Sequence, residues 1–165
     1  MPLQAPHFTS LGAVFFEPVS EAAQKIGTPI AAVFVDGDIN RTTYERTFDN
    51  MKGDRVDGLL VSDSAKHVTN RVLITELAAQ RRMPAIYPYR DFVDVGGLMA
   101  YSVDLADVFH RVADITDQIL KGTKPRDIPF YQQIKFELVL NRITAKSLGL
   151  ELPATLLPVA DEVIE

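Results

Sequence analysis

A short polar run, Ser62-Asp63-Ser64, ends a predicted buried strand, and His67 lies three residues further along the chain. A serine and a nearby histidine are the groups that serine hydrolases use, with the imidazole taking the hydroxyl proton. The α/β-hydrolase elbow also needs the pattern Gly-x-Ser-x-Gly, and neither serine has these glycines. A simpler interpretation is that Asp63 or Ser64 caps the helix that begins near His67. The sequence therefore favours a protein that is not an enzyme.

A second polar run, DGDIN, places Asp36, Asp38 and Asn40 at the first three ligand positions of a calcium loop. The match fails further along the loop, because position six is Arg41 where glycine is needed. Position twelve is Thr47, which cannot supply the bidentate carboxylate of such a site. We interpret the run as a polar loop at the carboxyl end of a strand.

The remaining metal ligands are sparse. His7 lies in a predicted amino-terminal leader, and His110 lies within a predicted helix; neither has a partner at metal-ligand spacing. The sequence contains no cysteine, which excludes disulfides, thiolate catalysis and cysteine zinc sites. We predict no metal site and no cofactor.

The third candidate is the loop YPYRD, which contains Tyr87, Tyr89 and Arg90 and is followed by Gly96-Gly97. The double glycine is not a phosphate loop, since it lacks both the G-x-G-x-x-G and the G-K-[ST] patterns. We interpret it as a source of backbone freedom. The pattern alone leaves two roles open for the tyrosines, packing in the core or contact with a ligand.

Predicted strands and helices alternate along most of the chain, which is typical of βαβ units and a parallel sheet covered on both faces. The predicted strands are residues 30–35, 57–62, 85–87, 97–102 and 130–141, and the predicted helices are residues 18–27, 42–52, 67–82, 104–121 and 143–148. Within this pattern, Asp104 is a predicted amino-terminal cap, and Gly122 a predicted end, of the fourth helix.

The polar runs share one position in this scheme. Asp36, the run Ser62 to Ser64 and the segment Tyr87 to Asp91 all follow predicted strands. Ligands of open α/β sheets bind beyond the carboxyl ends of the strands. The sequence therefore predicts that these residues form one rim of a ligand site.

Composition limits the class of protein. The 165 residues are 47 % apolar and 24 % charged, which is typical of one globular domain. The net charge of −5 and the lack of a basic stripe argue against a nucleic-acid partner. The sequence shows no export signal at its start and no apolar run of about 18 residues that would span a bilayer.

Several long motifs carry a family resemblance: PAIYPYRDFVDVGGLMAYSVDLADVF, ILKGTKPRDIPF, KFELVLNRITAKSLGL and ADEVIE. With them the chain resembles the carboxyl-terminal half of the ABC-transporter substrate-binding proteins linked to tryptophan and related amino acids. The resemblance is strong from Val56 to Glu165 and looser from Val19. The chain departs from the family pattern at the run beginning at Ser62, at Ser102, where glycine is common, and in lacking the amino-terminal lobe with its export signal.

The resemblance implies the fold of a type I periplasmic binding protein, in which two α/β lobes joined by three crossovers close on a solute. It implies a leader over residues 1–17 and one α/β lobe over residues 18–165, with residues 92–127 as an excursion into the other lobe. The double glycine then falls at a crossover. The returning strand is the segment 128–141.

If the other lobe is absent, the apolar stripe of the excursion helix has no sheet to cover it. Exposing each such side chain costs roughly 1.5 to 3 kcal/mol. Exchanging an element between two chains is a low-cost way to cover it. We therefore predict a homodimer in which the excursion is exchanged between chains.

The resemblance further implies a periplasmic or other extracytoplasmic location, an ABC permease as partner, and a small amino-acid-like solute bound without catalysis. Carboxylates would hold an ammonium group, hydroxyls would orient it, and aromatic faces would contact its side chain. The predicted binding residues are Ser62, Asp63, Tyr87, Tyr89, Tyr101 and Asp104. The alternative is a stand-alone oligomerising or interaction domain that has lost solute binding.

Overall fold

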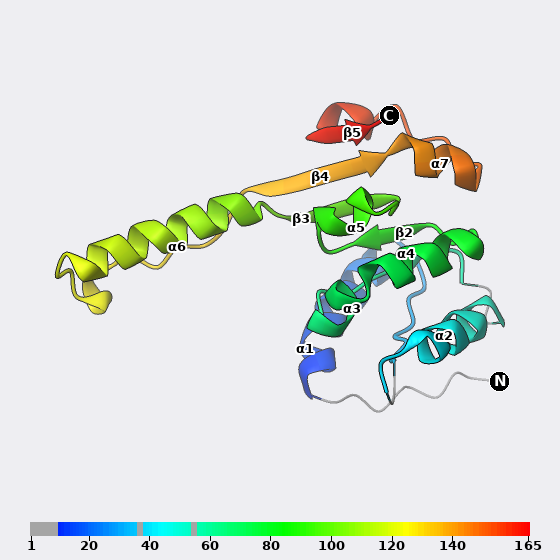
Figure 1. Ribbon diagram of the computed structural model, residues 1–165, viewed down its shortest axis with the longest axis horizontal. Helices are drawn as coiled ribbons and strands as arrows, with labels where there is room; N and C mark the ends of the chain where they lie inside the picture. The colour runs from blue at the N-terminus through cyan, green and yellow to red at the C-terminus, as the bar shows by residue number, and fades with distance from the viewer. Residues whose placement is uncertain (1–9, 36–37, 54–55) are drawn as a thin grey trace.

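The computed structural model describes residues 10–35, 38–53 and 56–165 (Figure 1). The interpretations of Asp36 and His7 fall outside these residues. Within them the chain forms a body built on a mixed sheet, from which one long helix projects (Figure 1).

The sheet of the described residues has five strands in the order β1-β2-β3-β4-β5. The strands are β1 (Leu59–Leu60), β2 (Ala85–Tyr87), β3 (Met99–Val103), β4 (Phe136–Asn141) and β5 (Glu162–Ile164). Strands β1, β2 and β3 are parallel, β4 is antiparallel to β3, and β5 is parallel to β4. The predicted α/β class with a mostly parallel sheet is confirmed. An exchange of elements between chains is not part of what the structure shows.

Helices flank this sheet and one of them leaves it (Figure 1). The α-helices are α1 (Ser10–Lys25), α2 (Arg41–Gly53), α3 (Ala65–Thr69), α4 (Arg71–Gln80), α5 (Arg90–Asp94), α6 (Leu105–Leu120) and α7 (Arg142–Leu148), and the 3-10 helices are η1 (Pro125–Asp127) and η2 (Leu157–Val159). The predicted helices at 42–52, 104–121 and 143–148 are confirmed as α2, α6 and α7.

The core lies between the sheet and helices α2, α4 and α5. Its largest fully buried side chains are Tyr44, Tyr87, Phe92, Leu77, Leu140, Val93 and Val139. They come from both the helices and the strands, so burial of apolar surface holds the layers together. Each buried side chain of this size contributes roughly 1.5 to 3 kcal/mol to the free energy of folding.

The prediction of a buried strand at residues 30–35 is wrong. The segment forms no strand, and Ile30, Val33 and Phe34 are 37 %, 46 % and 39 % exposed. An apolar run becomes a strand only where a neighbour takes its backbone hydrogen bonds. Here β1 is the edge of the described sheet and pairs with β2 alone. For the same reason the second predicted strand shortens to β1, in which Leu60 is half exposed.

Other differences concern the boundaries of elements. Helix α1 begins at Ser10, inside the predicted leader and before the predicted start at residue 18. The single helix predicted for residues 67–82 is two helices that meet at Asn70, whose side-chain amide donates to the carbonyl of Lys66. Helix α5 and strand β5 were not predicted. Both are short. The sequence pattern of α5 is that of a loop, and β5 lies in the carboxyl-terminal segment, which has no strand pattern.

The segment Asp104–Lys135, called the arm below, contains α6, η1 and the return to the sheet (Figure 1). The carboxylate of Asp104 accepts a hydrogen bond from the backbone N–H of Asp107, and Gly122 has a φ of +100°, so the predicted cap and end of the helix are confirmed. The returning strand is shorter than predicted. It begins at Phe136, where its pairing with β3 begins, and the preceding Phe130 and Ile134, which pair with no strand of the described residues, are 96 % and 81 % exposed.

The double glycine lies inside the body, before the base of the arm. Gly96 has a φ of +102°, a conformation that favours glycine, and it ends α5. Gly97 donates its backbone N–H to the carbonyl of Phe92 at 2.8 Å. A Cβ on Gly97 would lie 2.7 Å from that carbonyl and 2.7 Å from the ring of Tyr87. Close packing, as well as backbone freedom, therefore requires glycine here.

We predict that Gly97→Ala lowers the free energy of unfolding by about 1–3 kcal/mol, because the added methyl group has no space between Tyr87 and Phe92. Urea denaturation followed by circular dichroism measures the change. The matched control is Gly58→Ala, whose Cβ would meet its nearest atom at an ordinary 3.5 Å. Equal stability of the two variants would contradict this account of Gly97.

Candidate functional site

Three neighbouring parallel strands end along one edge of the sheet and carry most of the predicted site residues. Ser62 and Asp63 follow β1, Tyr89 follows β2, and Tyr101 and Asp104 lie on and just beyond β3. Neighbouring strands lie about 4.8 Å apart, so β1 and β3 are separated by roughly 10 Å across the sheet. By its register, β3 also continues four residues beyond the level of Leu60, the last residue of β1. This edge is called the rim below. The arm leaves the body from the end of β3, beside the rim (Figure 1).

The first part of the rim is a hydroxyl and imidazole pair. Oγ of Ser62 lies 3.0 Å from Nδ1 of His67. Ser64 occupies the amino-terminal cap position of α3, and its side chain makes no capping hydrogen bond. The sequence predicted a helix cap at Asp63 or Ser64. Ser64 does occupy the cap position, but its hydroxyl does not bond to the helix backbone. The hydroxyl of Ser62 bonds instead to the imidazole of His67.

Burial makes His67 a weak base. Desolvation lowers the pKa of its imidazole, and the charge of Lys66 lowers that pKa further, although a hydrogen bond from the imidazole to the backbone carbonyl of Ser62 opposes both effects. The ring also lies edge-on to Tyr44, with 6.1 Å between the two ring centroids. A neutral imidazole at neutral pH fixes the direction of the Ser62 hydroxyl. In the described part of the chain its hydrogen bonds run to Ser62 alone, without the third group that orients a catalytic histidine.

The two tyrosines of YPYRD separate in the structure. Tyr87 is 2 % exposed and stacks on Phe92 with 5.0 Å between ring centroids, and burial raises the pKa of its phenol. It is a core residue here and offers no face to a solute. Tyr89 is half-buried at the amino-terminal cap of α5, packed against the core from the rim side. Sequence pattern did not distinguish the two, because both flank the same proline.

Arg90 ties the rim to the far strands of the sheet. Its guanidinium hydrogen-bonds to the carboxylate of Glu162 on β5, with Nη2 3.0 Å from Oε1, and lies 3.6 Å from the carboxylate of Glu137 on β4. These carboxylates, with Asp94, raise the pKa of Arg90, and Arg90 lowers the pKa of Glu162. The arginine positions α5, and therefore Tyr89. Sequence reasoning missed this role because its partners lie 47 and 72 residues away along the chain, by their numbers.

The base of the arm supplies the other side of the rim. Tyr101 is 55 % exposed and stacks on Phe136 of β4, with 5.5 Å between ring centroids. Asp104 both caps α6 and forms an ion pair with Lys135, whose Nζ lies 2.6 Å from its carboxylate. The hydrogen bond from Lys135 and the one from Asp107 lower the pKa of Asp104. Asp104 is thus already engaged, whereas Asp63 is exposed and has no ion pair within the described residues.

The chemistry of the rim is that of hydroxyl, carboxylate and aromatic groups. The described residues of the chain contain no group of three or more metal-ligating side chains. A carboxylate, an oriented hydroxyl and two tyrosine rings are suited to an ammonium group and an apolar or aromatic side chain. A groove of about 490 Å³ is also present, but it lies along the arm and is lined by none of the predicted site residues. None of the described helices combines the length and the apolarity needed to cross a membrane.

Comparison with solved structures shows the fold. A conserved domain protein from Vibrio cholerae O1 biovar eltor aligns with a TM-score of 0.78 at 17 % identity, over 92 % of this chain and 50 % of its own. An ABC domain from Streptococcus pneumonia, solved in complex with L-Trp, aligns with a TM-score of 0.79 at 23 % identity, over 93 % and 52 %. The open, ligand-free CD0873 of Clostridium difficile, a substrate-binding protein with adhesive properties, aligns with a TM-score of 0.66 at 18 % identity, over 94 % and 51 %.

These solved proteins are about twice as long as the part that matches, so the chain spans about half of each of them. No curated protein matches the sequence. The sequence does match a family profile, that of the ABC transporter substrate binding proteins, over residues 17–164. The match covers the body, the rim and the whole arm. By this match, the chain belongs to the ABC transporter substrate-binding protein family.

Proposed function

We propose that the chain is a solute-binding lobe of an ABC-type uptake system, and that its rim forms one wall of a site for a free amino acid. The observation that carries the proposal is the position of the rim. Hydroxyl, carboxylate and aromatic groups gather at the carboxyl ends of three parallel strands, where open α/β sheets bind ligands. Membership of the family supports the transport context.

Asp63 is the carboxylate best suited to the ammonium group of the solute. It is exposed at the end of β1, whereas Asp104 is already bound to Lys135 and to the amino terminus of α6. The Ser62 hydroxyl, held by His67, lies next to it in the chain and would accept or donate a second hydrogen bond. Asp104 then acts at the edge of the site and positions the arm.

Tyr89 and Tyr101 supply aromatic faces for the solute side chain. Tyr101 is more than half exposed and is held flat against Phe136, which leaves one face of its ring for stacking. Tyr89 lies just beyond the end of the neighbouring strand, β2. The solved relative with bound L-Trp supports an aromatic amino acid as the first solute to test. Tyr87 belongs to the predicted set, but its burial assigns it to support of the rim.

The proposal places the protein outside the cytoplasm with an ABC permease as its partner, as is usual for this family. It also includes a homodimer, because the apolar face of the arm needs a cover. The alternative function, an oligomerising domain without a solute, is favoured by that exposed arm alone. It predicts dimerisation without any effect of amino acids on stability.

We predict that L-tryptophan or another aromatic amino acid raises the melting temperature of the chain. A ligand at a hundredfold excess over its Kd stabilises the folded state by about 2.7 kcal/mol. A thermal-shift screen of aromatic and aliphatic amino acids, followed by calorimetric titration of any that act, measures this effect. No shift with any of them would contradict the proposed function and favour the alternative.

The carboxylate of Asp63 gives the sharper test. Asp63→Asn is expected to weaken binding of that amino acid by roughly tenfold or more, because the ammonium group loses its charged partner. The matched control is Asp57→Asn, which removes an exposed carboxylate at the opposite end of β1. A Kd that does not change in Asp63→Asn, or that changes equally in both variants, would contradict the role of Asp63.

The buried imidazole gives a pH prediction. Because burial lowers the pKa of His67 in the folded state, the unfolded chain takes up a proton first as the pH falls through about 6.5. The contribution of neutral His67 to stability is therefore complete above that pH and is lost below it. Urea denaturation at about pH 7.5 and about pH 5 should show a larger loss of stability in the native chain than in His67→Gln. Equal losses in both proteins would contradict a lowered pKa.

A further inference from the structure

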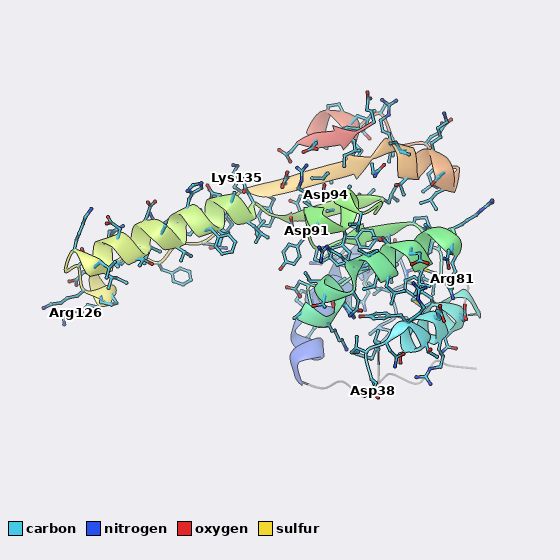
Figure 2. All side chains as sticks on the ribbon, in the orientation of Figure 1. Asp38, Arg81, Asp91, Asp94, Arg126 and Lys135 are labelled. Atoms are coloured by element: carbon cyan, nitrogen blue, oxygen red, sulfur yellow. The ribbon has the colours of Figure 1, made fainter. Side chains whose placement is uncertain are left out.

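A small cavity lies inside the body. Its walls come from α4, β2, the turn before β3 and α7, and it shares no lining residue with the groove along the arm. Figure 2 shows Arg81, just after α4, in the body and Lys135 at the base of the arm, so the cavity beside α4 is separate from the arm. The space open to the centre of a water molecule is about 10 Å³. One water needs roughly 10 to 15 Å³ of such space, so the cavity can hold one water and nothing larger.

Three hydroxyl groups line this cavity, those of Thr75, Tyr87 and Thr144, and the other lining side chains are apolar. The hydroxyl of Tyr87 lacks a partner. Tyr87 is 2 % exposed, and no group of the described residues forms a hydrogen bond with its hydroxyl. Burial raises the pKa of this phenol, and no hydrogen bond contributes to the shift. A buried hydroxyl without a partner destabilises the folded state, so a partner in the cavity would be favourable.

The two threonines offer acceptors to the same cavity. Oγ1 of Thr75 donates to the carbonyls of Arg71 and Val72 at 3.0 and 2.9 Å. Oγ1 of Thr144 donates to the carbonyl of Gly96 at 3.0 Å. These bonds use the single proton of each hydroxyl and leave its lone pairs, which no donor of the described residues fills. One unused donor and two unused acceptors therefore line a space of the size of a water molecule.

We propose that the cavity binds one water molecule, which accepts a hydrogen bond from the hydroxyl of Tyr87 and donates to the hydroxyl oxygens of Thr75 and Thr144. Water has two protons and two lone pairs, so this arrangement completes the hydrogen bonding of all three hydroxyls. Three hydrogen bonds are also the usual number for a buried water. A purely apolar cavity of this size would stay dry, and the three hydroxyls make the difference.

The water joins elements that are distant along the chain. It connects α4 through Thr75, β2 through Tyr87 and α7 through Thr144. The ring of Tyr87 is stacked on Phe92, and the water holds the hydroxyl end of the same ring. Tyr87 lies two residues before Tyr89, so the water becomes part of the support of the rim. This inference does not require that the rim binds a solute.

Tyr87→Phe tests whether the hydroxyl is bonded. If the water is present, the variant loses one of its hydrogen bonds, and the folding equilibrium constant measured by urea denaturation should fall roughly three- to tenfold. A hydroxyl without a partner predicts the opposite sign, because the substitution then removes a buried polar group at no loss. A folding constant that is unchanged or higher in Tyr87→Phe would overturn the proposal.

A double variant tests whether Tyr87 and Thr144 share one partner. Thr144→Val should lower the folding constant less in a chain that already carries Tyr87→Phe than in the native chain, because the shared water is then already lost. Thr144→Ser keeps the hydroxyl and should keep the full effect of Tyr87→Phe. The matched control is Thr47→Val, whose hydroxyl donates to the carbonyl of Thr43 outside the cavity and whose effect should simply add. Additive effects of Tyr87→Phe and Thr144→Val would count against a shared water.

A high-resolution crystal structure of the native chain gives the direct measurement. An ordered water oxygen is expected within about 3.2 Å of the hydroxyl oxygens of Thr75, Tyr87 and Thr144. The same structure of Tyr87→Phe should show this water weakened or lost. A cavity without ordered water in the native chain, or a water that misses any of the three hydroxyls, would show that the proposal is wrong.

Discussion

The stacking of Tyr87 on Phe92 is the contact on which the arrangement of the site depends. The two rings lie 5.0 Å apart and nearly parallel, and both are almost completely buried. They join the end of β2 to α5, and Gly97 fits against them where no side chain has space. Because this contact turns the chain back so tightly, β3 pairs directly with β2 and Tyr89 stays at the rim. A core contact thus determines where the candidate binding groups lie.

The sequence was most informative where local signals and packing agree. Helix α6 was predicted from its apolar spacing, its cap and its terminal glycine, and all three act in the structure as expected. The parallel strands β1 to β3 were predicted from short apolar runs bounded by turn residues. Residues 30–35 carry an equally strong apolar run and form no strand. Strand formation depends on a neighbour, and a sequence pattern does not show whether a neighbour is present.

The same limit applies to the rim. Its position was predictable because the ends of parallel strands lie on one edge of a sheet. The different burial of Tyr87 and Tyr89 was not predictable, since it depends on how α5 packs. Buried Phe92 fixes that packing, and the distant contacts of Arg90 with Glu137 and Glu162 add to it. The hydrogen bond between Ser62 and His67 was not predicted, because the sequence favoured a helix cap at Asp63 or Ser64 over a serine–histidine pair. Its orientation and the burial of the imidazole required the structure.

The arm and the rim are physically connected at Asp104. Its carboxylate caps α6 and holds Lys135, so it joins the outgoing and returning segments of the arm at their base. Tyr101 lies three residues before it and stacks on Phe136, which begins β4 just after Lys135. A solute that contacts the Tyr101 ring therefore contacts a residue whose support is the returning segment of the arm. The stacked rings and the ion pair of Asp104 with Lys135 therefore hold the end of the rim and the two segments at the base of the arm in one arrangement.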